Sequence, residues 1–81
     1  MELEITLFAG LKCNNPALSC FGDTEFRLAA GDGMTVGELR KFLEIDPNMR
    51  LLVMVNHHNK QEEWILKDND RVAIFPPIGG G

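Results

Sequence analysis

The segment Thr35-Val36-Gly37-Glu38 restricts the possible folds of this chain most, because it marks the start of a helix in mid-chain. It matches a capping box, in which a hydroxyl and a glutamate three residues later accept hydrogen bonds from free backbone N–H groups. Asp46-Pro47 predicts the helix end after about three turns, since the residue before proline avoids helical geometry. The stripe expected to face inward is Val36, Leu39 and Leu43 with Phe42 alongside, and the residues expected to face water are Glu38, Arg40, Lys41 and Glu44.

Two strands are predicted before this helix. Residues 2–8 and 24–30 both alternate between apolar and polar side chains, which is typical of half-buried strands, and the second is expected to run antiparallel to the first. Between them, residues 9–23 are rich in glycine and asparagine and predict a long loop. The inward residues are expected to be Leu3, Ile5, Leu7, Phe26 and Leu28, with Leu11, Leu18 and Phe21 folding parts of the loop back onto the body.

The segment after the helix predicts two or more further strands. The continuous apolar run 51–55 favours an interior strand or one covered on both faces, and residues 57–60 are expected to form the turn after it. In the mixed stretch that follows, Trp64 or Ile65 is expected to pack inward. Residues 67–70 predict a tight turn in which Asn69 adopts the left-handed conformation. Residues 71–75 form the last predicted strand, with Val72 and Ile74 on one face.

This order of elements predicts an α+β fold, in which the helix crosses one face of a mixed sheet of four to five strands. The opposite face is then open. Parity along the strands places Phe8 and Phe75 on that open face, beside Thr6 and Ala73, and a paired aromatic patch there is a candidate surface for docking a partner. The alternative is that Phe8 turns in and packs against the long loop.

The last six residues differ in kind from the domain expected at 1–75. Pro76 and Pro77 favour a short stiff stalk, and beyond Ile78 the glycines Gly79, Gly80 and Gly81 carry no side chain. Extended, these residues reach roughly 20 Å past Phe75. We expect residues 76–81 to be a flexible tail that enters a narrow channel on another protein and presents the carboxylate of Gly81 there.

Composition narrows the classes of partner. The net charge of −4 and the pI near 5.0 argue against nucleic acid. We see no charged-then-apolar leader and no apolar run near the ~20 residues that span a bilayer, so no membrane partner and a cytoplasmic location are expected. Cys13 and Cys20 could close a small disulfide-bonded loop, but because no export signal is seen we expect free thiols without catalytic or metal-binding roles. His57 and His58 are interpreted as solvated turn residues, so no metal site is predicted.

The end of the chain resembles a known family. Phe75, Pro76, Pro77, Gly80 and Gly81 match a terminal Phe-Pro-Pro-x-x-Gly-Gly pattern, and Asp68 and Asp70 match an acidic turn before the last strand. Together with Leu7-Phe8-Ala9 and the order of elements, these residues resemble the MoaD/ThiS-type sulfur carriers, which are ubiquitin-like β-grasp proteins. Among these, the molybdopterin synthase small subunit is the nearest likeness.

The resemblance implies a carrier rather than an enzyme. An E1-like adenylyltransferase would use ATP and magnesium to adenylate Gly81, and sulfur from a cysteine desulfurase or rhodanese-like donor would convert it to a thiocarboxylate. The acceptor would be a large synthase subunit or another sulfur acceptor enzyme, docked on Phe8 and Phe75, while residues 76–80 thread the partner's channel. No cofactor would be bound by the chain itself. Thiamine or another sulfur-containing metabolite as the destination, a ubiquitin-like modifier joined to lysines through Gly81, and a non-reactive interaction module are the alternatives.

Overall fold

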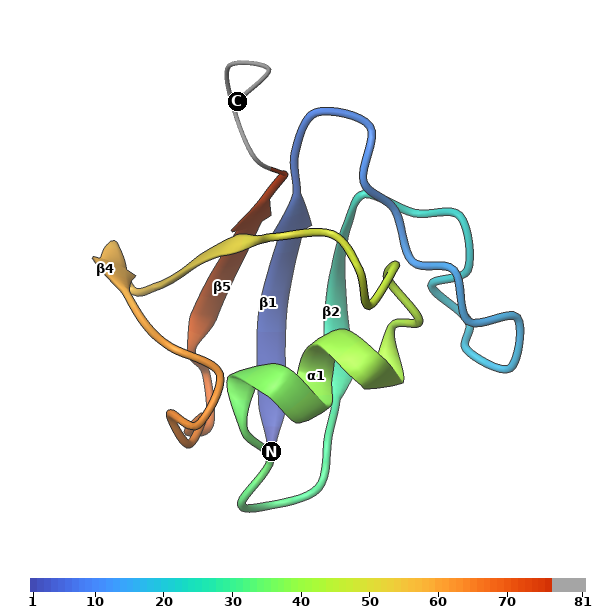
Figure 1. Cartoon of the computed structure of the whole chain (residues 1–81). Helices are drawn as coiled ribbons and strands as arrows, with labels where there is room; N and C mark the ends of the chain where they lie inside the picture. Colours follow the sequence, from blue (N-terminus) through green and yellow to red (C-terminus); the bar gives the residue numbers. More distant parts are fainter. Residues whose placement is uncertain (77–81) are drawn as a thin grey trace.

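A mixed five-stranded sheet with one helix on one side makes up the part of the chain that the computed structural model describes, residues 1–76 (Figure 1). The predicted α+β arrangement of one helix and a mixed sheet is confirmed. Within residues 1–76, no helix has the length and apolar character that crossing a bilayer needs. The elements are β1 (Glu2–Leu7), β2 (Glu25–Ala29), α1 (Val36–Phe42), β3 (Leu52–Val55), β4 (His58–Asn59) and β5 (Arg71–Phe75).

The first and last strands lie together near the middle of the sheet, whose order is β2-β1-β5-β3-β4. β1 pairs antiparallel with β2 and parallel with β5, and β3 pairs antiparallel with both β5 and β4. Parallel strands need a long crossover connection, which here contains α1. The chain therefore returns from β2 across one face of the sheet before β5 pairs with β1.

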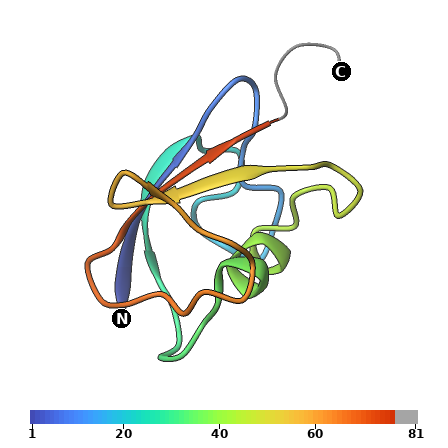
Figure 2. The same ribbon diagram turned by 60° about the vertical axis from the view of Figure 1, so that its left-hand side comes forward.

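The core lies between the sheet and α1, which Figure 2 shows on one side of the strands. Alternate residues of the strands point toward the helix, as their period of two requires. The apolar stripe of α1 meets them, as predicted. The buried residues from these elements are Leu3, Ile5, Leu7, Leu28, Val53, Val55, Val72 and Ile74 of the sheet and Val36 and Leu39 of α1, with Leu43 at its end.

The start of α1 has the predicted capping box. The backbone N–H of Thr35 donates to Glu38 Oε1 at 2.9 Å, and the backbone N–H of Glu38 donates to Thr35 Oγ1 at 3.2 Å. Thr35 itself has extended backbone angles, as an N-cap residue should. Two backbone donors at the helix start are thus satisfied reciprocally, which fixes the first residue of α1.

The predicted end of α1 at Asp46-Pro47 is wrong, because the helix has seven residues, about two turns. Glu44 has a φ of 55°, and its N–H donates to Lys41 O at 3.0 Å while the N–H of Ile45 donates to Arg40 O at 3.3 Å. These two bonds form a Schellman motif, which ends a helix with one left-handed residue. Glycine is usual at that position. Because Glu44 stands there instead, the sequence carries no glycine signal for the helix end.

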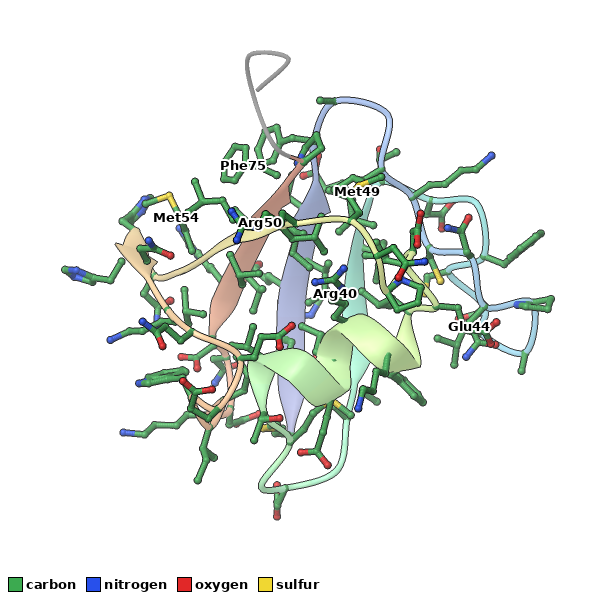
Figure 3. All side chains as sticks on the ribbon, viewed as in Figure 1. Arg40, Glu44, Met49, Arg50, Met54 and Phe75 are labelled. Atoms are coloured by element: carbon green, nitrogen blue, oxygen red, sulfur yellow. The ribbon has the colours of Figure 1, made fainter. Side chains whose placement is uncertain are left out.

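Arg40 does not face water as expected. Its side chain is only 13% exposed, and its guanidinium donates to the carbonyls of Asp46, at 2.7 Å, and Met49. It also pairs with Glu62 at 3.4 Å. Figure 3 shows Arg40 lying between α1 and the segment that carries Met49. The early stop lets the chain after α1 fold back within reach of this side chain.

The segment around β3 is partly as predicted. β3 lies between β5 and β4, which confirms the predicted interior strand. It is not covered on both faces, because Leu52 is 40% exposed and Met54 is half-buried, while Val53 and Val55 are buried. The turn after it lies at Asn56-His57, where both φ angles are positive, and His58–Asn59 forms β4 rather than part of the turn. Further on, Trp64 is half-buried, Ile65 is 55% exposed and Leu66 is the residue that is buried.

The two remaining connections are mostly as predicted. In the loop 9–23, Leu11 is buried and Leu18 is half-buried, but Phe21 is 57% exposed, so its predicted inward packing is wrong. In the turn before β5, Asn69 has the predicted left-handed φ, 67°. Asp70 is buried there, and its carboxylate accepts hydrogen bonds from Asn56 Nδ2 and Lys67 N–H, both at 2.8 Å.

Replacing Glu38 by glutamine tests the capping box through pH. The hydrogen bond from the Thr35 backbone, and after it the one with its side chain, lowers the pKa of the Glu38 carboxyl below its ordinary value of 4.5. A lowered folded pKa adds stability that is fully present above the unfolded pKa and is lost as pH falls through the folded one. Glutamine keeps the acceptor but not the charge. We therefore expect Glu38→Gln to be less stable than the parent at about pH 7 and equal to it at about pH 2, measured by urea unfolding.

The matched control is Glu63→Gln, which removes an exposed carboxylate outside the helix. A stability difference between the parent and Glu38→Gln that stays the same at both pH values would contradict the ionised capping box. So would an equal, pH-dependent loss in the control.

Candidate functional site

The sheet face opposite α1 carries the candidate site. Residues paired across the strands project on the same face, so the register fixes which side chains meet there. Within residues 1–76, this face has no helix over it (Figure 2). The side chains on it are Glu2, Glu4, Thr6 and Phe8 from β1 and its end, Glu25 and Arg27 from β2, Leu52 and Met54 from β3, and Arg71, Ala73 and Phe75 from β5.

Phe8 and Phe75 stack on one another, with ring centroids 4.5 Å apart and an angle of 6° between the ring planes. The β1–β5 register pairs Thr6 with Ala73, and two residues further along each strand come the two phenylalanines. The N–H of Phe8 donates to Ile74 O at 3.0 Å, which continues the parallel pairing past the end of β1. Phe8 is 41% exposed and does not turn in under the long loop. The predicted aromatic pair on the open face is confirmed.

Two side chains of β3 extend this pair, and sequence reasoning missed both. Leu52 pairs with Phe75, and Met54 pairs with Ala73. Figure 3 shows Met54 on β3 and Phe75 at the end of β5 on neighbouring strands. The alternation is hidden in 51–55 because every side chain is apolar, so only the pairing partner reveals which face each occupies. We call Phe8, Leu52, Met54, Ala73 and Phe75 the apolar patch.

The other end of the open face is charged. Arg27 pairs with Glu2 at 2.8 Å and with Glu4 at 3.2 Å, and Arg71 pairs with Glu4 at 3.0 Å. All four side chains are at least 44% exposed, so each pair adds little stability. The hydrogen bond and the charge of Glu2 raise the pKa of Arg27, so its guanidinium stays charged. The open face therefore divides into an apolar end and a charged end.

A shallow hollow of about 670 Å³ lies between these ends. Thr6 and Ala73 line its middle, Phe8 and Phe75 lie at one end, and Glu4 and Arg71 at the other. His57, which is exposed in the turn after β3, also lines it. The hollow brings together apolar side chains and ion-paired ones, which suits contact with another protein surface.

The apolar patch adjoins the start of the predicted tail, because Phe75 ends β5 and Pro76 follows it, half-buried. The other predicted tail residues, Pro77, Ile78, Gly79, Gly80 and Gly81, lie outside the described residues. The structure thus places Phe8, Phe75 and Pro76 together, and the role of each stays a prediction.

The two cysteines lie in the loop between β1 and β2, and the two histidines follow β3. Cys13 and Cys20 are free thiols, as expected, but both are buried, with their sulfur atoms 3.1 Å apart in the loop between β1 and β2. His57 in the turn after β3 and His58 in β4 are both exposed, as predicted for solvated residues. Across residues 1–76, no three histidine, cysteine or acidic side chains come together as a metal ion would require.

Several solved structures share this fold. The small archaeal modifier protein SAMP1 of Haloferax volcanii matches with a TM-score of 0.69 at 20% identity, covering 100% of each chain. A second protein of that organism, solved in solution, matches with a TM-score of 0.71 at 26% identity, covering 100% of this chain and 87% of its own. A chain from the complex of subunits 1 and 2 of the Helicobacter pylori molybdopterin-converting factor matches with a TM-score of 0.60 at 23% identity, covering 100% of each chain.

A ubiquitin from Caldiarchaeum subterraneum also matches, with a TM-score of 0.63 at 16% identity over 100% of this chain and 98% of that one. These likenesses confirm the ubiquitin-like β-grasp fold. No curated protein matches the sequence. The sequence model of the ThiS family, however, matches residues 11–81, which include the last strand and the whole predicted tail. The chain therefore belongs to the ThiS family, among the MoaD/ThiS-type ubiquitin-like proteins.

Proposed function

We propose that this protein is a sulfur carrier whose Gly81 carboxylate is adenylated and then converted to a thiocarboxylate. The observation that carries the proposal is the ThiS family match, which extends through Gly80 and Gly81. We propose further that the functional form ends at Gly81, either as encoded or after processing. The apolar patch beside Pro76 supports this reading, because it would hold a partner where the tail begins.

The tail suits the chemistry of an activated carboxyl group. A carboxylate is a poor electrophile, so an E1-like adenylyltransferase would join Gly81 to AMP with ATP and magnesium, and sulfur would then replace AMP. Gly80 and Gly81 have no Cβ atoms, which leaves the carbonyl open to attack and lets the tail enter a narrow channel. Pro76 and Pro77 restrict the free tail and so reduce the entropy lost on threading. The sulfur would come from a cysteine desulfurase or a rhodanese-like protein.

For the acceptor we propose a large synthase subunit docked on the apolar patch, with molybdopterin synthesis as the destination of the sulfur. The Helicobacter pylori structure, a complex of subunits 1 and 2 of a molybdopterin-converting factor, supports a partner of this kind. The described domain offers exposed apolar and ion-paired side chains rather than a group of catalytic ones. We infer that it carries the reacting group and that its partners supply the catalysis.

A ubiquitin-like modifier is the second candidate, because the fold is shared with SAMP1 and with a ubiquitin. A modifier would use the same adenylated Gly81 but would transfer it to lysine side chains of other proteins. The two functions therefore differ in the fate of the activated carboxyl group and not in its activation.

Intact-mass analysis of the protein from its native host separates these functions. We expect a fraction of the protein to gain the mass that corresponds to exchange of one oxygen for sulfur at Gly81. A variant with one leucine added after Gly81 should lose this species, since the added side chain would block threading. It should keep its Tm, because the core is built from residues that precede the tail. Gly-Gly remnants on lysines of other proteins would instead support the modifier. Finding neither product, in cells that require the pathway, would overturn both functions.

Replacing Phe8 by alanine tests the apolar patch. Removing one ring of the stack should weaken binding of the large subunit or the adenylyltransferase about tenfold or more, because buried aromatic anchors supply much of an interface's energy. The matched control is Phe21→Ala, which removes a phenylalanine that is 57% exposed in the loop 9–23. Calorimetric titration of both variants with the same partner gives the comparison. Unchanged affinity for Phe8→Ala, or an equal loss in both variants at unchanged fold, would contradict docking at the patch.

A further inference from the structure

The loop between β1 and β2 holds two thiols together in the interior. Cys13 is 0% exposed and Cys20 is 4% exposed, although most of their neighbours in the loop face water. The thiol of Cys20 donates to the sulfur of Cys13, and the two sulfur atoms are 3.1 Å apart. Neither thiol belongs to the apolar patch or to the tail, so the proposed carrier function leaves this pair unexplained.

The backbone of the loop fixes this approach. The N–H of Cys13 donates to Asp23 O at 3.0 Å, and the N–H of Gly22 donates to Cys13 O at 2.8 Å. A turn then links Asp23 back to Cys20, because the N–H of Asp23 donates to Cys20 O at 2.8 Å. Both cysteines are therefore tied to the same short backbone ladder, which keeps their side chains on one side of the loop.

The same loop is attached to the end of α1. The N–H of Asn14 donates to Leu43 O at 2.9 Å, and Asn15 Nδ2 donates to Phe42 O at 2.8 Å. These carbonyls lie in the last turn, where a helix has no internal donors for them. A constraint on residues 13–20 thus also holds the residues that cap the C-terminal end of α1.

We propose that Cys13 and Cys20 form a reversible intramolecular disulfide, a modification that locks this loop onto the end of α1. Disulfide formation brings the sulfur atoms to about 2.05 Å, so they move about 1 Å closer while the backbone ladder stays in place. The proposal does not depend on the carrier function. Because residues 13–20 lie on the side of the sheet away from β5 (Figure 1), oxidation leaves the apolar patch as it is.

The reaction partner is a low-molecular-weight disulfide such as oxidised glutathione. One cysteine thiolate attacks it, forming a mixed disulfide and releasing one reduced glutathione. The second cysteine then attacks the protein sulfur of that mixed disulfide and releases the other glutathione. The protein loses two electrons and two protons, and these appear in the two glutathione thiols.

The burial of the two thiols makes this thiol–disulfide exchange slow. Burial first, and then the neighbouring Cys13 sulfur, raises the pKa of the Cys20 thiol to about 11, so it is protonated at neutral pH and a poor nucleophile. Exchange therefore requires the loop to open, and we expect a stable dithiol that oxidises slowly rather than a sensitive surface thiol.

The full chain is incubated at about pH 8 with excess oxidised glutathione for several hours, and analysed by intact mass and thermal unfolding. The expected product is a monomer that has lost two hydrogen atoms. Digestion with trypsin should place that loss in the peptide 13–27, which contains both cysteines. Closing a loop of eight residues should raise the Tm by roughly 10 °C, and dithiothreitol should reverse both changes.

Two variants make the test specific. Cys13→Ala and Cys20→Ala should lose the intramolecular product, and their Tm should not rise after the same treatment. A wild-type chain that stays fully reduced, forms only dimers or glutathione adducts, or loses the hydrogens without a rise in Tm would overturn the proposal. If a variant fails to fold, the mass and Tm of the wild-type chain still decide the question.

Discussion

The parallel pairing of β1 with β5 is the interaction on which the rest of the structure depends. It joins the two ends of the described chain in the middle of the sheet, and it requires the crossover that places α1 over one face. Its register also decides the site, because Thr6 lies beside Ala73 and this pairing brings Phe8 against Phe75. A slip of one residue would turn Phe75 toward the core and Ile74 toward water. The same register therefore maintains the core and the apolar patch.

Hydrogen bonds in the turn before β5 and at the end of α1 tie the connecting segments to this sheet and helix. The buried carboxylate of Asp70 accepts hydrogen bonds from Asn56 and Lys67, so the start of β5 is tied to the turn after β3. A buried acceptor that loses its donors costs about 1–3 kcal/mol, which discourages alternative pairings here. At the other side of the core, Asn14 and Asn15 satisfy carbonyls at the end of α1. The long loop is thus part of the packed domain and not an appendage.

Local signals predicted the elements well, whereas properties that depend on a distant partner were missed. The capping box predicted the start of α1 because both of its partners lie within four residues. Parity predicted the Phe8–Phe75 pair because each strand alternates cleanly. The run 51–55 hides its alternation, so Leu52 and Met54 became visible only through their pairing with β5. The helix stop at Glu44 and the approach of Cys13 to Cys20 depend on backbone bonds that residue type alone does not reveal.

The division of the open face into an apolar and a charged end has a consequence for how a partner would be held. Exposed ion pairs such as Arg71–Glu4 contribute little binding energy, but an incorrectly placed partner would have to desolvate them without replacement. On the proposed function, the binding energy would be concentrated on Phe8 and Phe75, beside Pro76 at the end of β5. A partner bound there would lie directly beside the start of the tail. On the proposed function, five residues from Pro77 to Gly81 separate Pro76 from the reacting carboxylate, which would limit its reach to about 17 Å. A fixed starting point for the tail would then matter more than extra contact area.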